Sequence, residues 1–140
     1  MAFKIMLDTN IILDLTLERT QDYADLRKIY ARITGGYLKC YTTTSIIQTS
    51  AYWLVKEKGL IQTKKIILAI LNDITIIEAN HDIVVDAMYS TMNDIDDAMQ
   101  YYTALHHKLD AFISRDKDFI KSATSKLPVY HPEDFIRKFI

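Results

Sequence analysis

Three aspartates that lie far apart in the sequence are the main candidates for chemistry in this chain. Asp8 follows an apolar run that ends at Leu7, Asp97 lies in an acidic segment, and Asp116 follows the apolar run 111–114. Carboxylates that crowd together repel one another and resist ionisation unless a divalent cation neutralises them. Mg²⁺ and Mn²⁺ prefer such oxygen ligands together with water. Brought together, these acids predict a Mg²⁺ or Mn²⁺ site that could activate water and stabilise charge on a phosphoryl oxygen.

Each of these acids, taken alone, also has an ordinary structural explanation. Asp8 fits a helix cap, and Asp116 with Asp118 fits a turn. Asp97 is less easily explained in this way, because the nearby Tyr101 indicates a helix face turned toward the protein. The metal hypothesis therefore depends on the set of acids and not on any single one.

Other kinds of catalytic site find less support in the sequence. The four histidines have no zinc-ligand spacing, and no second cysteine accompanies Cys40, which we predict to be a core residue. No glycine-rich phosphate loop is present. A phosphatase with Asp8 as nucleophile would need a second acid two residues later, where Asn10 stands.

The elements that must position the acids alternate between strands and helices. Apolar runs predict strands at 4–8, 38–42, 74–77, 111–114 and 129–130. Helical spacing and caps predict helices from residue 11, over 21–34, 46–55, 60–71, 82–88, 94–107 and 118–123, and from residue 132.

Strands that are apolar throughout and separated by helices predict a mostly parallel sheet covered on both faces. The expected fold class is therefore α/β, a three-layer α/β/α sandwich. In such sheets ligands gather at the carboxyl ends of the strands. Asp8 and Asp116 both fall at strand ends, so we expect them to project toward the same edge.

Composition limits the class of protein. The 140 residues, 49% of them hydrophobic, predict one domain over residues 1–140. Lys and Arg number 17 against 18 Asp and Glu, so any contact with nucleic acid must be local or assisted by metal. The single cysteine, the lack of a leader segment and the lack of a long apolar run predict a cytoplasmic protein without a membrane span.

Three segments together resemble the PIN-domain family: 7–14 (LDTNIILD), 94–101 (DIDDAMQY) and 113–119 (ISRDKDF). The match spans nearly the whole chain. The resemblance implies a metal-dependent ribonuclease fold, often that of the toxin in a VapC-type toxin and antitoxin pair. It also implies an endoribonuclease in which water activated by Mg²⁺ or Mn²⁺ attacks the phosphodiester and leaves 5′-phosphate and 3′-hydroxyl ends.

The resemblance also implies a role for individual residues. Asp8, Asp97 and Asp116 match the catalytic, metal-binding acids of the family. Supporting positions are Thr9, Asn10, Ser114 and Asp118.

One family position departs from the pattern. The family commonly places a Glu in the helix after the second strand, where this chain has no carboxylate, and Gln48 is the nearest candidate. A neutral amide in place of a charge should lower metal affinity, and a second ion could be lost. Asp14 is predicted to stand behind the metal ligands; the alternative is an exposed helix carboxylate. Asp14 could partly compensate for the Glu, or the site could work with three acids and one Mg²⁺, and the sequence leaves both open.

The expected partner is RNA, whose phosphate Arg115 or Lys117 could bind; the alternative is that both are solvated surface charges. The resemblance also implies an antitoxin protein, and we expect a homodimer. The alternative function, suggested by Gln48, is a catalytically weakened PIN-like module that binds protein or RNA.

Overall fold

The computed structural model describes residues 2–19 and 23–140. Its centre is a five-stranded sheet in which every neighbouring pair is parallel. The strands are β1 (Phe3–Leu7), β2 (Leu38–Thr42), β3 (Ile74–Ile76), β4 (Ala111–Ile113) and β5 (Val129–Tyr130), in the order β3-β2-β1-β4-β5. All five predicted strands are confirmed. Because parallel neighbours cannot be joined by a tight turn, the connections must cross over, and helices fill them.

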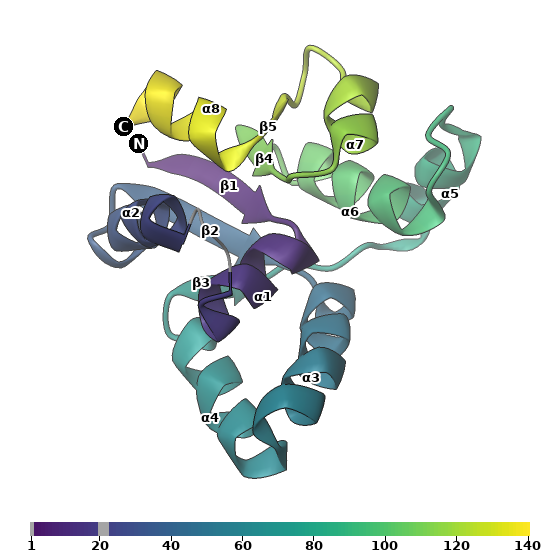
Figure 1. Cartoon of the computed structure of the whole chain (residues 1–140). Coiled ribbons are helices and arrows are strands. Elements are labelled where there is room, and N and C mark those ends of the chain that lie inside the picture. The colour runs from purple at the N-terminus through teal and green to yellow at the C-terminus, as the bar shows by residue number, and fades with distance from the viewer. Residues whose placement is uncertain (1, 20–22) are drawn as a thin grey trace.

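The described residues form eight helices around this sheet (Figure 1). They are α1 (Thr9–Leu17), α2 (Tyr23–Thr34), α3 (Thr44–Lys58), α4 (Leu60–Leu71), α5 (His81–Tyr89), α6 (Ile95–His106), α7 (Lys117–Ser122) and α8 (Pro132–Phe139). The predicted helices are present, although the predicted start of α2 at Gln21 lies outside the described residues.

The start of α1 was predicted wrongly. The helix begins at Thr9 and not at Ile11, because the side chain of Asp8 accepts the N–H of Thr9 and so serves as the N-cap. Thr9 and Asn10 therefore lie inside the first turn of the helix. Asp8 thus follows β1 directly and also caps α1.

Burial shows that both faces of the sheet are covered. Successive side chains of a strand point to opposite faces, yet Ile5, Met6 and Leu7 in β1 are all buried, as are all three residues of β4. The predicted three-layer α/β/α arrangement is confirmed. The arrowheads of β1 and β2 point toward the side of the molecule where α5, α6 and α7 lie (Figure 1).

The register of the central strands sets the geometry of that edge. Leu7 of β1 is paired with Ile113 of β4, so the residues that follow, Asp8 and Ser114, leave the sheet side by side. The backbone N–H of Asp8 donates to the carbonyl of Ile113 at 3.0 Å and extends this pairing by one residue.

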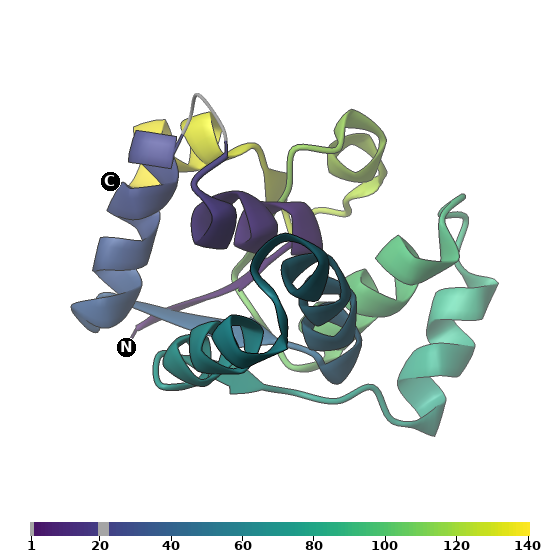
Figure 2. The same cartoon turned by 60° about the horizontal axis from the view of Figure 1, so that its bottom comes forward.

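Helices α3 and α4 pack against each other as a hairpin that projects from the rest of the fold (Figures 1 and 2). Their connection at Gly59 has φ 83°, a conformation that glycine adopts without strain. Apolar side chains remain exposed on the hairpin, among them Trp53, Ile61 and Leu68. None of the helices in the described parts of the chain combines the length and the apolar character needed to cross a membrane.

Candidate functional site

The acids predicted from the sequence lie at the N-terminal ends of three helices. Asp8 caps α1, and its Oδ1 accepts the next backbone N–H at 2.8 Å. Asp116 caps α7 and accepts the N–H two residues later at 3.0 Å. Asp97 lies in the first turn of α6, whose N-cap is Asp94. Unpaired N–H groups and the helix dipole stabilise carboxylates at such positions, so the caps explain why acids stand here but do not use all of their oxygens.

Ser114 joins two of these acids. Its side chain is completely buried, and its Oγ donates to Oδ2 of Asp8 at 2.7 Å. The same oxygen accepts the backbone N–H of Asp116 at 3.1 Å. One hydroxyl therefore fixes the end of β1 relative to the turn after β4, which gives physical content to the supporting position predicted for this residue.

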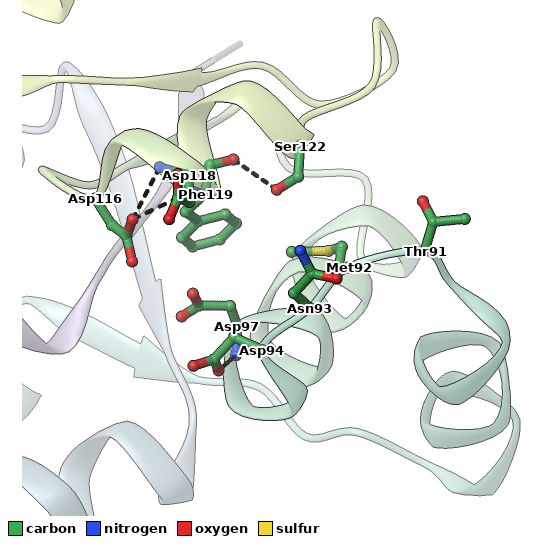
Figure 3. Close-up of a pocket in the computed structure, with 9 residues that line it drawn as sticks. All are labelled: Thr91, Met92, Asn93, Asp94, Asp97, Asp116, Asp118, Phe119 and Ser122. Atoms are coloured by element: carbon green, nitrogen blue, oxygen red, sulfur yellow. Dashed lines mark hydrogen bonds between the residues drawn. The ribbon is translucent and has the colours of Figure 1, made fainter.

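A cavity of about 310 Å³ opens beside these helix ends (Figure 3). The carboxylates of Asp97 and Asp116 turn toward the same space from opposite walls. The lining residues are Thr91, Met92, Asn93, Asp94, Asp97, Asp116, Asp118, Phe119 and Ser122. Four carboxylates and few apolar groups make this a place for a cation or a polar ligand.

Electrostatic coupling places Asp8 in the same neighbourhood. The pKa of Asp97 is raised to about 7, chiefly by burial and then by the charges of Asp94, Asp8, Asp116 and Asp96. The pKa of Asp8 is also raised, chiefly by burial, although its hydrogen bonds with Ser114 and Thr9 oppose the shift. Asp8 and Asp97 are therefore electrostatically coupled, and the charge of Asp116 contributes to the shift of both.

We predict that Asp97→Asn stabilises the metal-free protein at about pH 8. A carboxyl whose folded-state pKa is raised adds stability that is complete below its ordinary value of 3.8 and lost as the pH rises through about 7. The amide removes that loss, with an expected gain of about 1 kcal/mol, since the side chain is partly exposed and water screens it.

Urea unfolding in EDTA at about pH 5 and about pH 8 measures this effect, which should be larger at the higher pH. Asp82→Asn, at an exposed acid in the first turn of α5, is the matched control and should not stabilise the protein. Equal stability of the Asp97 variant and the wild type at both pH values would contradict the coupling of the acids.

The donor chemistry of the cavity fits Mg²⁺ or Mn²⁺. Within residues 2–19 and 23–140, no Lys, Arg or His forms an ion pair with Asp8, Asp97 or Asp116. The same residues contain no group of three His, Cys, Asp or Glu side chains already arranged to hold a metal ion. Shared repulsion without a counter-charge favours a hard cation, toward which the carboxylates would have to turn.

The remaining predicted positions differ in burial and in whether they line the cavity. Thr9 is partly buried in the first turn of α1, and Asn10 beside it is exposed. Lys117 and Asp118 are both exposed at the start of α7, and Asp118 lines the cavity. Gln48 lies exposed in the second turn of α3, and among the described residues no hydrogen bond joins it to an acid.

For Asp14 and for Arg115, the structure excludes one of the two interpretations that the sequence allowed. Asp14 is only 6% exposed, so the alternative of an exposed helix carboxylate is wrong. Arg115 is partly buried and forms an ion pair with Asp14, so it is not a solvated surface charge either. The pair joins the turn after β4 to α1, a proximity that the sequence does not reveal.

Sequence reasoning missed a buried polar contact one turn further along α6. The Oγ1 of Thr43, the N-cap of α3, donates to Oε1 of Gln100 at 2.8 Å, and Gln100 is 5% exposed. Gln100 follows Asp97 by three residues and so shares its face of the helix. That spacing was the only available signal, and nothing in the sequence identified Thr43 as its partner.

Comparison with known proteins places the chain in a family. The family model described as PIN domain matches residues 4–118. None of the curated proteins matches the sequence significantly.

Several solved structures share the fold at low sequence identity. VapBC2 from Rickettsia felis, bound to a DNA fragment from its promoter, has a TM-score of 0.69 and 13% identity over 92% of this chain and 98% of its own. The sarcin-ricin loop cleaving toxin VapC20 of Mycobacterium tuberculosis has a TM-score of 0.68 and 12% identity, with 87% and 97% covered. A toxin-antitoxin complex from Klebsiella pneumoniae has a TM-score of 0.68 and 21% identity, with 91% and 97% covered.

Proposed function

Because the chain belongs to the PIN-domain family, we propose that it is a divalent-metal-dependent endoribonuclease that hydrolyses phosphodiester bonds in RNA. The observation that carries the proposal is the shared electrostatic neighbourhood of Asp8, Asp97 and Asp116, in which the pKa of Asp97 is raised to about 7 and no described cation compensates the acids. Groups that are perturbed in this way beside a cavity are candidates for a functional site.

We assign the metal ligands to Asp8, Asp97 and Asp116. A bound Mg²⁺ or Mn²⁺ supplies positive charge for the scissile phosphate and lowers the pKa of water. Ser114 keeps Asp8 in place by donating to its Oδ2, which leaves lone pairs of both Asp8 oxygens for a cation. Asp118, exposed at the mouth of the cavity, is the acid we assign to an auxiliary position.

Lys117 is the side chain that we propose for contact with an RNA phosphate. It is exposed and follows Asp116 directly, so it stands beside the acids without being held by them. Arg115 is less suited to that role, because its guanidinium already binds the buried carboxylate of Asp14. The near-neutral net charge of the chain is compatible with such a local contact.

Two measurements test the proposal together. We expect isothermal titration calorimetry to detect binding of Mn²⁺ to the wild type, and we expect cleavage of an RNA substrate in Mg²⁺ or Mn²⁺ that stops in EDTA and returns when metal is added back. Cleavage that continues unchanged in EDTA would contradict the mechanism. Binding of RNA without cleavage would favour the second candidate, a weakened binding module, which the neutral Gln48 supports.

We further propose that the protein is the toxin of a toxin and antitoxin pair. Two of the structures with the same fold come from VapBC or toxin-antitoxin complexes. The exposed apolar side chains of the α3–α4 hairpin, with Trp53 45% and Ile61 75% exposed, favour a protein partner, either an antitoxin or a second copy in a homodimer. Light scattering of the protein alone, and after co-expression with the product of an adjoining gene, separates these arrangements.

A further inference from the structure

The carboxylate of Asp14 lies within α1, close to the acids but turned to other partners. Its Oδ1 accepts from Nε of Arg19 at 2.7 Å, and its Oδ2 accepts from Nη1 of Arg115. The side chain is only 9% exposed. A buried carboxylate is tolerated when cations and hydrogen bonds compensate it, and here two guanidinium groups do so. Because both oxygens are used, Asp14 is poorly placed to serve as a metal ligand.

The partner of Asp14 belongs to the turn that carries a metal-binding acid. Arg115 stands between Ser114, which donates to Asp8, and Asp116, which caps α7. The two contacts reach the turn from different points of the same helix, since Asp8 precedes α1 and Asp14 lies six residues further along. The backbone N–H of Ser114 also ties the turn to β5 by donating to the carbonyl of Tyr130 at 2.9 Å. The ion pair with Asp14 adds a side-chain contact that fixes Arg115, in the middle of the turn, against α1.

This second contact has consequences for the charge balance of the turn. Asp116 is exposed, so packing alone does not fix its carboxylate, and it is repelled by the other acids. Without the Asp14 carboxylate, Arg115 would lose one of its partners, and the acids beside it would attract its guanidinium more strongly. A shift of the guanidinium toward them would compete with a divalent cation for the same oxygens.

We propose that Asp14 is a positioning residue for the acidic cavity: through Arg115 it holds the turn 114–116 in the orientation that lets Asp8 and Asp116 share a cation. This inference rests on the proposed function, because it assumes that the acids bind metal. It replaces the expectation that Asp14 compensates for the missing Glu as an additional acid near the metal.

The test compares Mn²⁺ affinity in matched variants by calorimetry. We expect Asp14→Asn to weaken Mn²⁺ binding by roughly tenfold, as is usual when a residue that orients metal ligands is replaced. Arg115→Lys keeps the charge but loses the planar fork of donors, and it should weaken binding in the same direction. Glu133→Gln, which breaks an exposed ion pair with Arg137 on α8, is the control and should bind as the wild type does.

A double variant asks whether Asp14 acts through Arg115. Asp14→Asn combined with Arg115→Gln should bind Mn²⁺ no more weakly than the worse single variant, because both changes break the same contact. Independent, additive losses would overturn this route. If wild type binds Mn²⁺ and Asp14→Asn binds it equally well, the positioning role is wrong while the proposed function stands. A wild type that binds no Mn²⁺ would overturn both.

Hydrogen exchange in the absence of metal separates a local role from a general loss of stability. The amide of Asp116 donates to Ser114, and the amide of Asp8 donates to Ile113. In Asp14→Asn we expect faster exchange at these two amides while the pairing of β1 with β2 stays protected. An equal loss of protection throughout the chain would overturn the proposal, since Asp14 would then serve only general stability.

Discussion

Replacing Asp97 by Asn is expected to reduce the rate of metal-dependent RNA cleavage by roughly a thousandfold while the protein stays folded. The loss corresponds to about 4 kcal/mol of transition-state stabilisation, which is within what a metal ion contributes to charge stabilisation. Asn retains the size and one carbonyl oxygen of Asp but lacks the negative charge that attracts a hard cation. Initial rates of cleavage at saturating Mg²⁺ measure the effect.

Asp96→Asn is the matched control for this variant. Asp96 is the adjacent residue on α6, carries the same charge and is exposed, but it does not line the cavity. Its replacement should reduce the rate far less than replacement of Asp97. Circular dichroism and melting temperature establish that both variants are folded. An unchanged rate in Asp97→Asn would remove the central acid of the proposed mechanism.

Asp97→Asn is also expected to stabilise the metal-free protein. The loss of cleavage and the gain of stability have the same origin. Burial and then the charges of Asp94, Asp8 and Asp116 oppose ionisation of Asp97, so the metal-free fold loses stability when that carboxyl ionises. A divalent cation turns this unfavourable repulsion into binding energy. Loss of function with a gain of stability in one variant would be the behaviour of a site that is strained for its ligand.

The positions of Asp8 and Asp116 could be predicted because they depend on short-range features. An apolar run followed by an acid marks the end of a buried strand, and parallel strands end at one edge. Asp97 could be predicted for a similar reason, since its helix cap and the buried Tyr101 are visible within one segment. Local periodicity is sufficient for features of this kind.

Contacts that depend on the packing of distant segments could not be predicted. The pair of Asp14 and Arg115 spans 101 residues of sequence, and the pair of Thr43 and Gln100 spans 57. Each of these side chains also fits an exposed helix or turn position, and only the meeting of two elements decides its partner. The first residue of α1 was predicted incorrectly for a different reason. Asp8, Thr9 and Asn10 are all acceptable N-caps, and the sequence does not show which of them caps the helix.

Replacing Gln48 by Glu is expected to strengthen Mn²⁺ binding by roughly tenfold to a hundredfold, because ligand charge sets much of the affinity of such sites. Helix α3 begins directly after β2, whose Tyr41 is paired with Met6 of β1, so its first turns start at the same sheet edge as Asp8. Gln48 is exposed there, and a carboxylate at this position can reach solvent or a cation without displacing core side chains.

The same variant should also change the stability of the metal-free protein. If residue 48 occupies the family's Glu position, a further negative charge there adds repulsion to the acids without metal, so Gln48→Glu should lower the free energy of unfolding in EDTA while it raises Mn²⁺ affinity. Gln62→Glu, the same change at an exposed position of α4, should do neither. Tighter binding without the loss of metal-free stability would mean that the new carboxylate does not interact with the acids. Unchanged binding in a wild-type background that holds Mn²⁺ would mean that three aspartates form the complete site and that Gln48 does not occupy the family's Glu position.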